Sequence, residues 1–175
     1  MKNMKLSVKL IGAFAVVALF CLIVGFIGWL GIFTTEKALN EVNDNTLPSV
    51  QAMEIINEAQ TDIKAYQRTL LIPEFVKSNS EVERFHKKIA AAWERVDKAW
   101  KIYEPIPRTK EEEAAWKQFV PMWELWKKQS NEFDELIKAG KRDEAISLAE
   151  GKLRESFNHA EKLLGEIIEI NMKGA

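Results

Sequence analysis

Cysteine is nearly absent from this sequence, and its one copy, Cys21, lies inside a long apolar run near the N-terminus. The rest of the chain therefore contains no disulfide bond, and its fold must depend on packing. The sequence also lacks a Cys-x-x-Cys-His motif for covalent haem, a glycine-rich phosphate loop and a nucleophile paired with a base. These absences argue against an enzyme and against a bound cofactor.

Histidine is also scarce, with two copies in the chain. A di-iron helical bundle needs a Glu-x-x-His motif on each of two helices, and Glu83 and His86 supply one such pair. The other histidine, His159, follows Ser156 at the same spacing, so the second motif is missing. We therefore expect no metal site, and we interpret His86 as a solvated side chain beside a charged helix face.

Acidic residues are absent before residue 34, and the same segment carries Lys2, Lys5 and Lys9. The 24 residues from Leu10 to Phe33 include no charge. As a helix rising about 1.5 Å per residue they would span roughly 36 Å, enough to cross a hydrocarbon core of about 30 Å. A cleaved signal peptide is the alternative, but its apolar region is normally only about 7–15 residues long. We therefore expect a retained transmembrane helix over residues 10–33.

The charges around this helix predict its orientation in the bacterial cytoplasmic (inner) membrane. Positive charge is retained on the cytoplasmic side, so we expect residues 1–9 in the cytoplasm and residues 34–175 outside, in the periplasm or the cell exterior. The outer segment contains all 26 acidic residues and 22 of the 25 basic ones, a net charge of about −4. That charge argues against nucleic acid or anionic lipid as the partner of the outer segment.

Glycine and proline are sparse after residue 33, where they separate four helical segments. Apolar residues recur at steps of three and four through each segment, as the buried face of an amphipathic helix requires. We expect helices over 34–71, 80–103, 109–140 and from about residue 143 to the end. The short connections favour antiparallel neighbours. The predicted fold is all-α, with the N-terminal transmembrane helix continuing into an antiparallel up-down-up-down four-helix bundle.

Two sequences of the Ser/Thr-x-x-Glu type predict where the second and third helices begin. In such a capping box, the hydroxyl and the carboxylate each accept a hydrogen bond from the other residue's backbone amide. The first candidate pairs Ser80 with Glu83, and the second pairs Thr109 with Glu112.

Proline and glycine predict where helices are interrupted or end. Pro48 should kink the first helix and Pro121 should bend the third, because proline has no amide hydrogen to donate within a helix. Gly140 is expected to cap the C-terminus of the third helix.

Five tryptophans lie in the outer segment. Trp93 and Trp100 are seven residues apart in the second helix, and Trp116 and Trp123 are seven apart in the third. This spacing places each pair on one face of its helix, which favours aromatic layers in the core. An aromatic ligand pocket is the alternative.

A polar stripe follows the first outer helix. Gln60, Lys64 and Arg68 occur at steps of four, so we expect them on one helix face. One interpretation is a solvated surface on which Asp62 balances the charge of Lys64. The other is a ligand contact, because an arginine fork suits the geometry of a carboxylate.

Several short segments occur in a characteristic order along the chain. They follow a lysine-flanked anchor that leads directly into a helix, and they are Asn45–Pro48, the polar stretch Gln60–Leu71, Thr109–Glu113, Leu136–Gly140 and, closing an alanine-rich fourth helix, Glu169–Asn171. Their order and spacing resemble the four-helix-bundle sensor domain of methyl-accepting chemotaxis proteins, the bacterial chemoreceptors. The resemblance covers nearly the whole chain.

The resemblance implies a homodimeric outer domain that binds a small molecule. In such receptors a second membrane helix, a HAMP linker and a cytoplasmic signalling coil normally follow. Receptors of this type place cationic side chains on the first outer helix, near the dimer interface, where they hold a ligand carboxylate. We therefore predict an anion site formed by Arg68 with Lys64 and Gln60 assisting, although this helix has one arginine where better-known amino-acid receptors have several.

Other roles stay open at this point. The same outer domain also precedes histidine kinases and diguanylate cyclases, so the resemblance leaves the cytoplasmic output undecided. A periplasmic binding protein, rather than a free small molecule, is a possible partner. An alternative of another class is a membrane-anchored scaffold that senses nothing and docks partner proteins.

Overall fold

The computed structural model describes residues 6–173, which form helices and turns without a strand and confirm the all-α prediction. The chain divides into an N-terminal unit that ends at Asn43 and a second unit that begins at Asp44. Each unit is described separately below.

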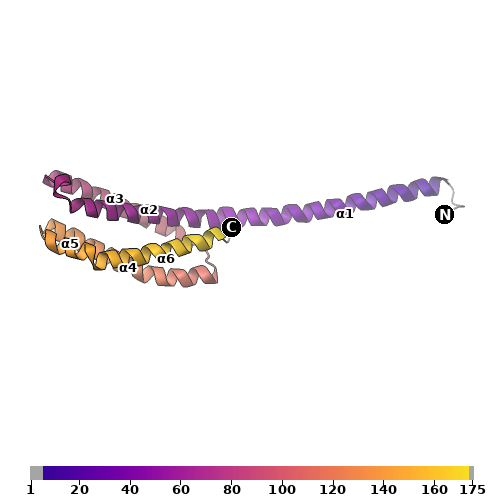
Figure 1. Ribbon diagram of the computed structural model, residues 1–175. Helices are drawn as coiled ribbons and strands as arrows, with labels where there is room; N and C mark the ends of the chain where they lie inside the picture. Colours follow the sequence, from indigo (N-terminus) through magenta and orange to yellow (C-terminus); the bar gives the residue numbers. More distant parts are fainter. Residues whose placement is uncertain (1–5, 174–175) are drawn as a thin grey trace. The chain divides into compact units, whose positions relative to one another are not determined.

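The N-terminal unit is built on one long α-helix, α1 (Leu6–Glu41), labelled in Figure 1. Wherever the structure describes their exposure, the side chains from Leu10 to Phe33 are exposed. Within the described residues, this is the one helix that is long and apolar enough to cross a membrane. Lys2 and Lys5, which carry part of the orientation argument, lie outside the described residues.

A π-helical segment, Val42–Thr46, interrupts the α-helix before α2 (Leu47–Leu70) begins. Pro48 lies in the first turn of α2 and has no amide hydrogen to close an α-helical bond to residue 44. The predicted interruption at Pro48 is therefore present, and it takes the form of a π-helical turn just before the proline.

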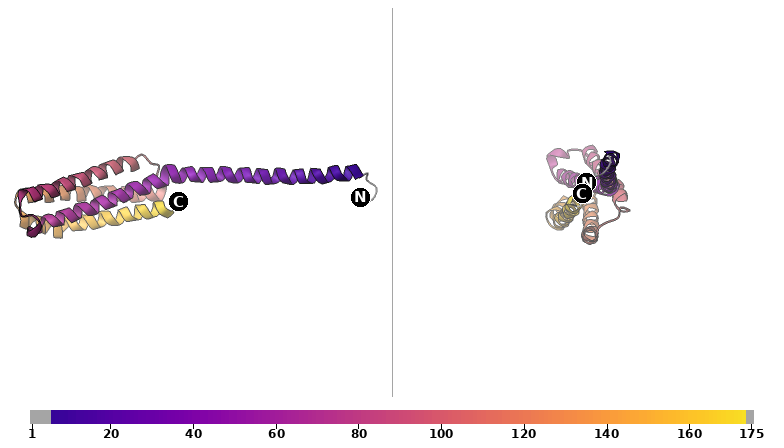
Figure 2. Two further views of the ribbon diagram at one scale, coloured as in Figure 1. Left: turned by 90° about the horizontal axis from the view of Figure 1, so that it is seen from above. Right: turned by 90° about the vertical axis from the view of Figure 1, so that its right-hand side faces the viewer.

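The second unit is the predicted antiparallel bundle. It contains α2, α3 (Asn79–Tyr103), α4 (Lys110–Lys138), α5 (Arg142–Glu150) and α6 (Lys152–Lys173), with a short 3₁₀ turn at Pro73–Phe75. Figures 1 and 2 show α2 and α4 running in one direction, and α3 and the α5–α6 segment returning. The start of α2 and the end of α6 therefore lie at the same end of the bundle.

The capping box of α3 lies two residues earlier than the sequence suggested, so the prediction for Ser80 and Glu83 was wrong. Ser78 has an extended backbone (φ −141°, ψ 154°), and its Oγ accepts a hydrogen bond from the amide of Glu81 (3.4 Å). The Glu81 carboxylate accepts one from the amide of Ser78 in return (3.2 Å). Both serine–glutamate pairs have the required spacing, but Ser80 already lies in the first helical turn.

The predicted capping box of α4 is confirmed. The Thr109 hydroxyl accepts from the amide of Glu112 (3.2 Å), and the Glu112 carboxylate accepts from the amide of Thr109 (3.4 Å). Pro121 lies inside α4 and the helix continues through it, so the bend expected there stays a prediction.

Gly140 ends α4 as predicted, with φ +73°, a conformation that side chains with a Cβ rarely adopt. The amide of Gly140 donates to the carbonyl of Ile137 (3.0 Å), and the amide of Lys141 donates to that of Leu136 (2.9 Å). These two bonds form a Schellman motif, which satisfies carbonyls at the helix end.

The fourth bundle helix is divided at Gly151 into α5 and α6, which corrects the prediction of one continuous helix. Gly151 has φ −104° and ψ −111°, yet its amide still donates to the carbonyl of Ser147 (3.1 Å). Its own carbonyl accepts from the amide of Glu155 (3.1 Å). A Cβ at Gly151 would lie 3.2 Å from the Ser147 carbonyl oxygen, a closer approach than most side chains tolerate.

The most extensive backbone packing in the bundle joins α2 to α3 and α4 to α6. Aromatic rings fill the space between α3 and α4, which confirms the core interpretation of the tryptophans. Trp123 is 1% exposed, and its ring centroid lies 5.9 Å from that of Trp93 and 6.0 Å from that of Trp100. Trp100 also contacts Trp116, with centroids 4.7 Å apart. The aromatic side chains of this layer are Trp93, Trp100, Tyr103, Trp116, Phe119, Trp123 and Trp126.

Two glycines of the fourth bundle helix should respond differently to alanine. A Cβ at Gly165 meets no atom within 4 Å, so Gly165→Ala should raise the free energy of unfolding by about 0.5–1 kcal/mol through helix propensity alone. Gly151→Ala should give no such gain, because the new methyl group presses on the Ser147 carbonyl. Urea denaturation of the full chain in mild detergent, followed by tryptophan fluorescence, measures both. An equal gain for the two variants would show that the break at Gly151 does not need a glycine.

Candidate functional site

The three residues of the predicted anion site do not share one environment. Gln60 is fully buried, Lys64 is half-buried and Arg68 is exposed. Each step of four residues on a helix of 3.6 residues per turn rotates the side chain by about 40°, so the stripe winds from the core to the surface. The expectation that these residues share one face was wrong for Gln60, whose Nε2 donates to Asn57 Oδ1 (3.0 Å) inside the bundle.

Lys64 and Arg68 line a small cavity of about 40 Å³ in the second unit, between α2 and the α5–α6 segment. Arg154 of α6 also lines it, and sequence patterns gave no reason to associate this residue with α2. Besides these three cationic residues, the cavity has a mainly apolar lining. The other lining residues are Gln67, Ala149, Leu153 and Phe157. The cavity spans the helix break at Gly151. On the α5–α6 wall, Ala149 precedes Gly151, and Leu153, Arg154 and Phe157 follow it.

Lys64 lies against an aromatic ring in this cavity. Its Nζ is 3.6 Å from the centroid of the Phe157 ring, a cation–π contact. Burial lowers the pKa of Lys64, and nearby Arg68 lowers it further, while Glu161 acts in the opposite direction. An anion in the cavity would therefore favour the charged form of Lys64.

Arg68 and Arg154 differ from the other arginines that the bundle uses structurally. Arg95 bonds Glu58 (3.1 Å) and Asp62, Arg108 bonds Glu113 (2.7 Å), and Arg142 donates to the carbonyl of Leu71. Within residues 6–173, no side-chain hydrogen bond or ion pair is found for either arginine of the cavity. Their guanidinium groups are thus available for a ligand.

Asp62 does not balance the charge of Lys64, which corrects the solvated-face interpretation. Its carboxylate instead pairs with Arg95 of α3, and that contact ties α2 to α3. The hydrogen bond that Arg95 donates to Asp62 also favours the charged form of Arg95, whose pKa is raised.

Gln67 connects the cavity to α4. It is 4% exposed, and its Nε2 donates to Ser130 Oγ (2.8 Å), to the Ser130 carbonyl (3.2 Å) and, more weakly, to Asp134 Oδ1 (3.5 Å). Burial raises the pKa of Asp134 to about 6, although the Gln67 hydrogen bond and the charge of Lys138 oppose the shift. This carboxyl group is therefore poorly solvated in the folded protein.

His86 lies beside the same end of α4 and is not solvated as the sequence suggested. It is half-buried, and its Nε2 is buried without a hydrogen-bond partner. Burial lowers its pKa, and the charge of Lys138 lowers it further, while Glu135 raises it. Within the described residues, no group of three or more potential ligands could hold a metal ion.

A buried polar cluster joins three helices at the opposite end of the bundle. Glu112 is 4% exposed and accepts hydrogen bonds from the Tyr103 hydroxyl (2.6 Å) and from Asn171 Nδ2 (2.8 Å). Burial, followed by the hydrogen bond and charge of Glu112, raises the pKa of Tyr103. The last turns of α6 are thereby tied to the first turn of α4.

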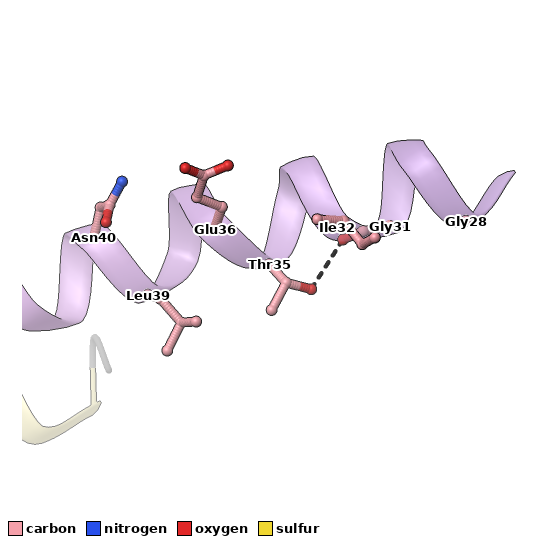
Figure 3. Close-up of a pocket in the computed structure, with 7 residues that line it drawn as sticks. All are labelled: Gly28, Gly31, Ile32, Thr35, Glu36, Leu39 and Asn40. Carbon is pink, nitrogen blue, oxygen red and sulfur yellow. Dashed lines mark hydrogen bonds between the residues drawn. The ribbon is translucent and has the colours of Figure 1, made fainter. Parts of the chain in front are cut away.

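A hollow along α1 is not a comparable site. Figure 3 shows Thr35 and Leu39 on one side of a single helix and Glu36 and Asn40 on the other. The Thr35 hydroxyl donates to the carbonyl of Gly31 (2.9 Å), as the dashed line shows. This trough follows the surface of one helix, so it does not converge polar groups on a ligand.

Residues 3–175 match a family described as a four helix bundle sensory module for signal transduction. The chain belongs to this family. The match confirms the resemblance to the sensor domain of chemotaxis receptors, and it assigns the bundle a role in sensing. A comparison with curated proteins found no match.

The stability of the sensory module should depend on pH through Asp134. Between its ordinary pKa of 3.8 and the folded value of about 6, the folded state binds a proton that the unfolded state does not, so this carboxyl lowers stability as pH rises through that range. Asp134→Asn removes the buried charge. At pH 7.5 it should raise the free energy of unfolding by about 2 kcal/mol, with allowance for partial exposure.

Urea denaturation of both proteins between pH 4 and pH 7.5 measures this difference. The gain from Asp134→Asn should shrink toward zero near pH 4, where the wild-type carboxyl is protonated in the folded state. A gain that stays constant across this range would assign the stabilisation to something other than the charge of Asp134.

Proposed function

We propose that this sensory module is the extracytoplasmic ligand-sensing domain of a transmembrane chemoreceptor, and that it binds a small anion such as a carboxylate. The observation that carries the proposal is the cavity whose lining includes Lys64, Arg68 and Arg154. A carboxylate there would accept charge-assisted hydrogen bonds from guanidinium groups that lack a partner within the described residues. Gln60, buried beside Asn57, supports α2 from the core and does not line the cavity.

The length and composition of α1 support the proposed membrane placement. An apolar helix of this length suits a bilayer, and the lysines before it together with the acidic residues after it favour a cytoplasmic N-terminus. The outer placement of residues 34–175 fits a receptor that meets its ligand outside the cell. We also propose a homodimer through α2 and α6, because membrane helices that hold two chains side by side raise their effective concentration.

A ligand between α2 and α6 provides a route for signalling. It shifts the relative position of these helices only if it binds two positions with different affinity. Packed helices move in small steps of about 1–2 Å, which suffice to pass a signal along a continuous helix. The start of α2 and the end of α6 lie at one end of the bundle, so both helices are placed to carry such a shift (Figure 2).

The output of this sensing stays a matter of proposal. Chemotaxis is the leading candidate, and a histidine kinase or diguanylate cyclase is the alternative. At the tip of the bundle, Phe75 is 56% exposed. A periplasmic binding protein could dock on this tip, and the module would then sense the ligand indirectly. A scaffold without sensing is less favoured, because the family is one of sensory modules.

Replacing Arg68 by alanine should separate ligand binding from stability. Arg68 is exposed and makes no ion pair within the described residues, so its loss should leave the melting temperature nearly unchanged. Binding of a carboxylate that stabilises the wild-type chain in a thermal screen should weaken by about 10- to 100-fold. Calorimetric titration of the full chain in detergent measures this change, with Arg84→Ala, an exposed arginine of α3, as the control. Equal affinities for wild type and Arg68→Ala would remove Arg68 from the site.

The topology has its own test in intact cells. A cysteine introduced at Asn131, an exposed position of α4, in a Cys21→Ser background should react with a membrane-impermeant thiol reagent added from outside. Where an outer membrane is present, it is permeabilised first. Labelling that requires rupture of the cytoplasmic membrane would contradict the proposed orientation.

A further inference from the structure

We infer that each single chain carries one complete site for a small monocarboxylate, in the cavity between α2 and α6, with Arg154 as the third cationic side chain. This inference rests on the proposed function and goes beyond it in three respects. It places the ligand within one subunit and not between two, it assigns Arg154 to the site, and it names the class of anion.

The walls of the cavity come from α2 and the α5–α6 segment of one chain. Lys64 and Arg68 come from α2, and Arg154 comes from α6, three residues before Phe157 and therefore on a neighbouring helix face. Lys64 is held over the Phe157 ring, so the two helices already meet through a cationic group and an apolar one. The second subunit is not needed to bring the three cations together.

Charge also favours an anion in this cavity. Among the described residues, no ion pair neutralises Lys64, Arg68 or Arg154, whereas Arg95 and Arg108 are both paired with carboxylates. Burial disfavours the charged form of Lys64, Glu161 favours it and Arg68 disfavours it, in that order of size. An anion between Lys64 and Arg68 would offset the repulsion between their two positive charges.

The size and lining of the cavity favour a small carboxylate. Its volume of about 40 Å³ compares with the roughly 10–15 Å³, measured in the same way, that one water molecule needs. A carboxylate group fits such a space, and a longer molecule would extend beyond it. Ala149, Leu153 and Phe157 contribute apolar lining, which favours a carboxylate with a short apolar tail over inorganic phosphate.

The test uses propionate as the probe and the full chain in lipid nanodiscs. Saturation-transfer NMR gives the affinity of wild type, Arg154→Gln and the control Lys152→Gln, which removes the same charge two residues away on α6 at a position that does not line the cavity. We expect Arg154→Gln to weaken binding by at least tenfold and Lys152→Gln to change it less than twofold. Circular dichroism and melting temperatures establish that both variants are folded. Unchanged binding by Arg154→Gln overturns the inference.

Mixed chains distinguish a site within one subunit from a site between two. Arg68→Gln and Arg154→Gln chains are reconstituted together. If the site lies within a chain, every chain in the mixture remains defective, and propionate binding stays at the level of the single variants. If the site is shared across a dimer, mixed dimers regain an intact site, and recovery of binding overturns the inference.

Two further outcomes separate this inference from the proposed function. Loss of binding in Arg68→Gln with wild-type binding in Arg154→Gln would leave an anion sensor but reject the site within one subunit. Inorganic phosphate that binds as tightly as propionate would reject the monocarboxylate class. Absence of propionate binding to the wild-type chain would overturn the inference, whereas the thermal screen with other carboxylates would still test the proposed function.

Discussion

Packing of large aromatic rings between α3 and α4 is the interaction on which the bundle depends. The bundle has no disulfide, because the single cysteine lies in α1. The most extensive backbone packing occurs within the pairs α2–α3 and α4–α6, and the aromatic layer joins α3 of the first pair to α4 of the second. Trp123 and Trp126 are each 1% exposed, and their rings contact one another with centroids 4.8 Å apart. Burial of such rings, with their favourable tilted geometry, stabilises this side of the bundle.

The α2–α6 side of the bundle has a cavity where the α3–α4 side has packed aromatic rings. There α2 faces α6 across a small cationic cavity, and the helix break at Gly151 lies in the cavity wall. Arg142 ties α5 to the end of α2, and Asn171 ties the end of α6 to Glu112. Under the proposed function, a ligand in the cavity would act on the α5–α6 segment between these two contacts, next to the break at Gly151.

Periodicity of apolar residues predicted the helices and most of the core. Ile63 in α2, Phe119 in α4 and Ile167 in α6 each belong to the apolar stripe of their own helix, and all three are 0% exposed. The errors arose where the outcome depends on contacts between helices. Gln60 is buried because the stripe winds around α2, and Arg154 could be joined to Lys64 only by the packing of α6 on α2.

The sequence motifs that mark where helices begin and break were misjudged for a different reason. The start of α3 was misplaced because Ser78 and Ser80 both precede a glutamate by three residues, and the sequence does not rank the two. Gly151 was not recognised as an interruption, since a single glycine in a helical pattern is often tolerated. Its significance appears only with the close approach of the Ser147 carbonyl.

The central claim is that anion binding moves α6 relative to α2 while the aromatic side stays fixed. Pulsed dipolar distances between spin labels test it most directly, in a Cys21→Ser background diluted with unlabelled chain. One pair joins exposed Ala65 of α2 to Asn158 of α6, and a second joins Ala65 to Lys98 of α3. Saturating propionate should shift the first distance by about 1–2 Å and leave the second unchanged. A first distance that does not respond to bound ligand, or an equal shift in both pairs, would contradict the account.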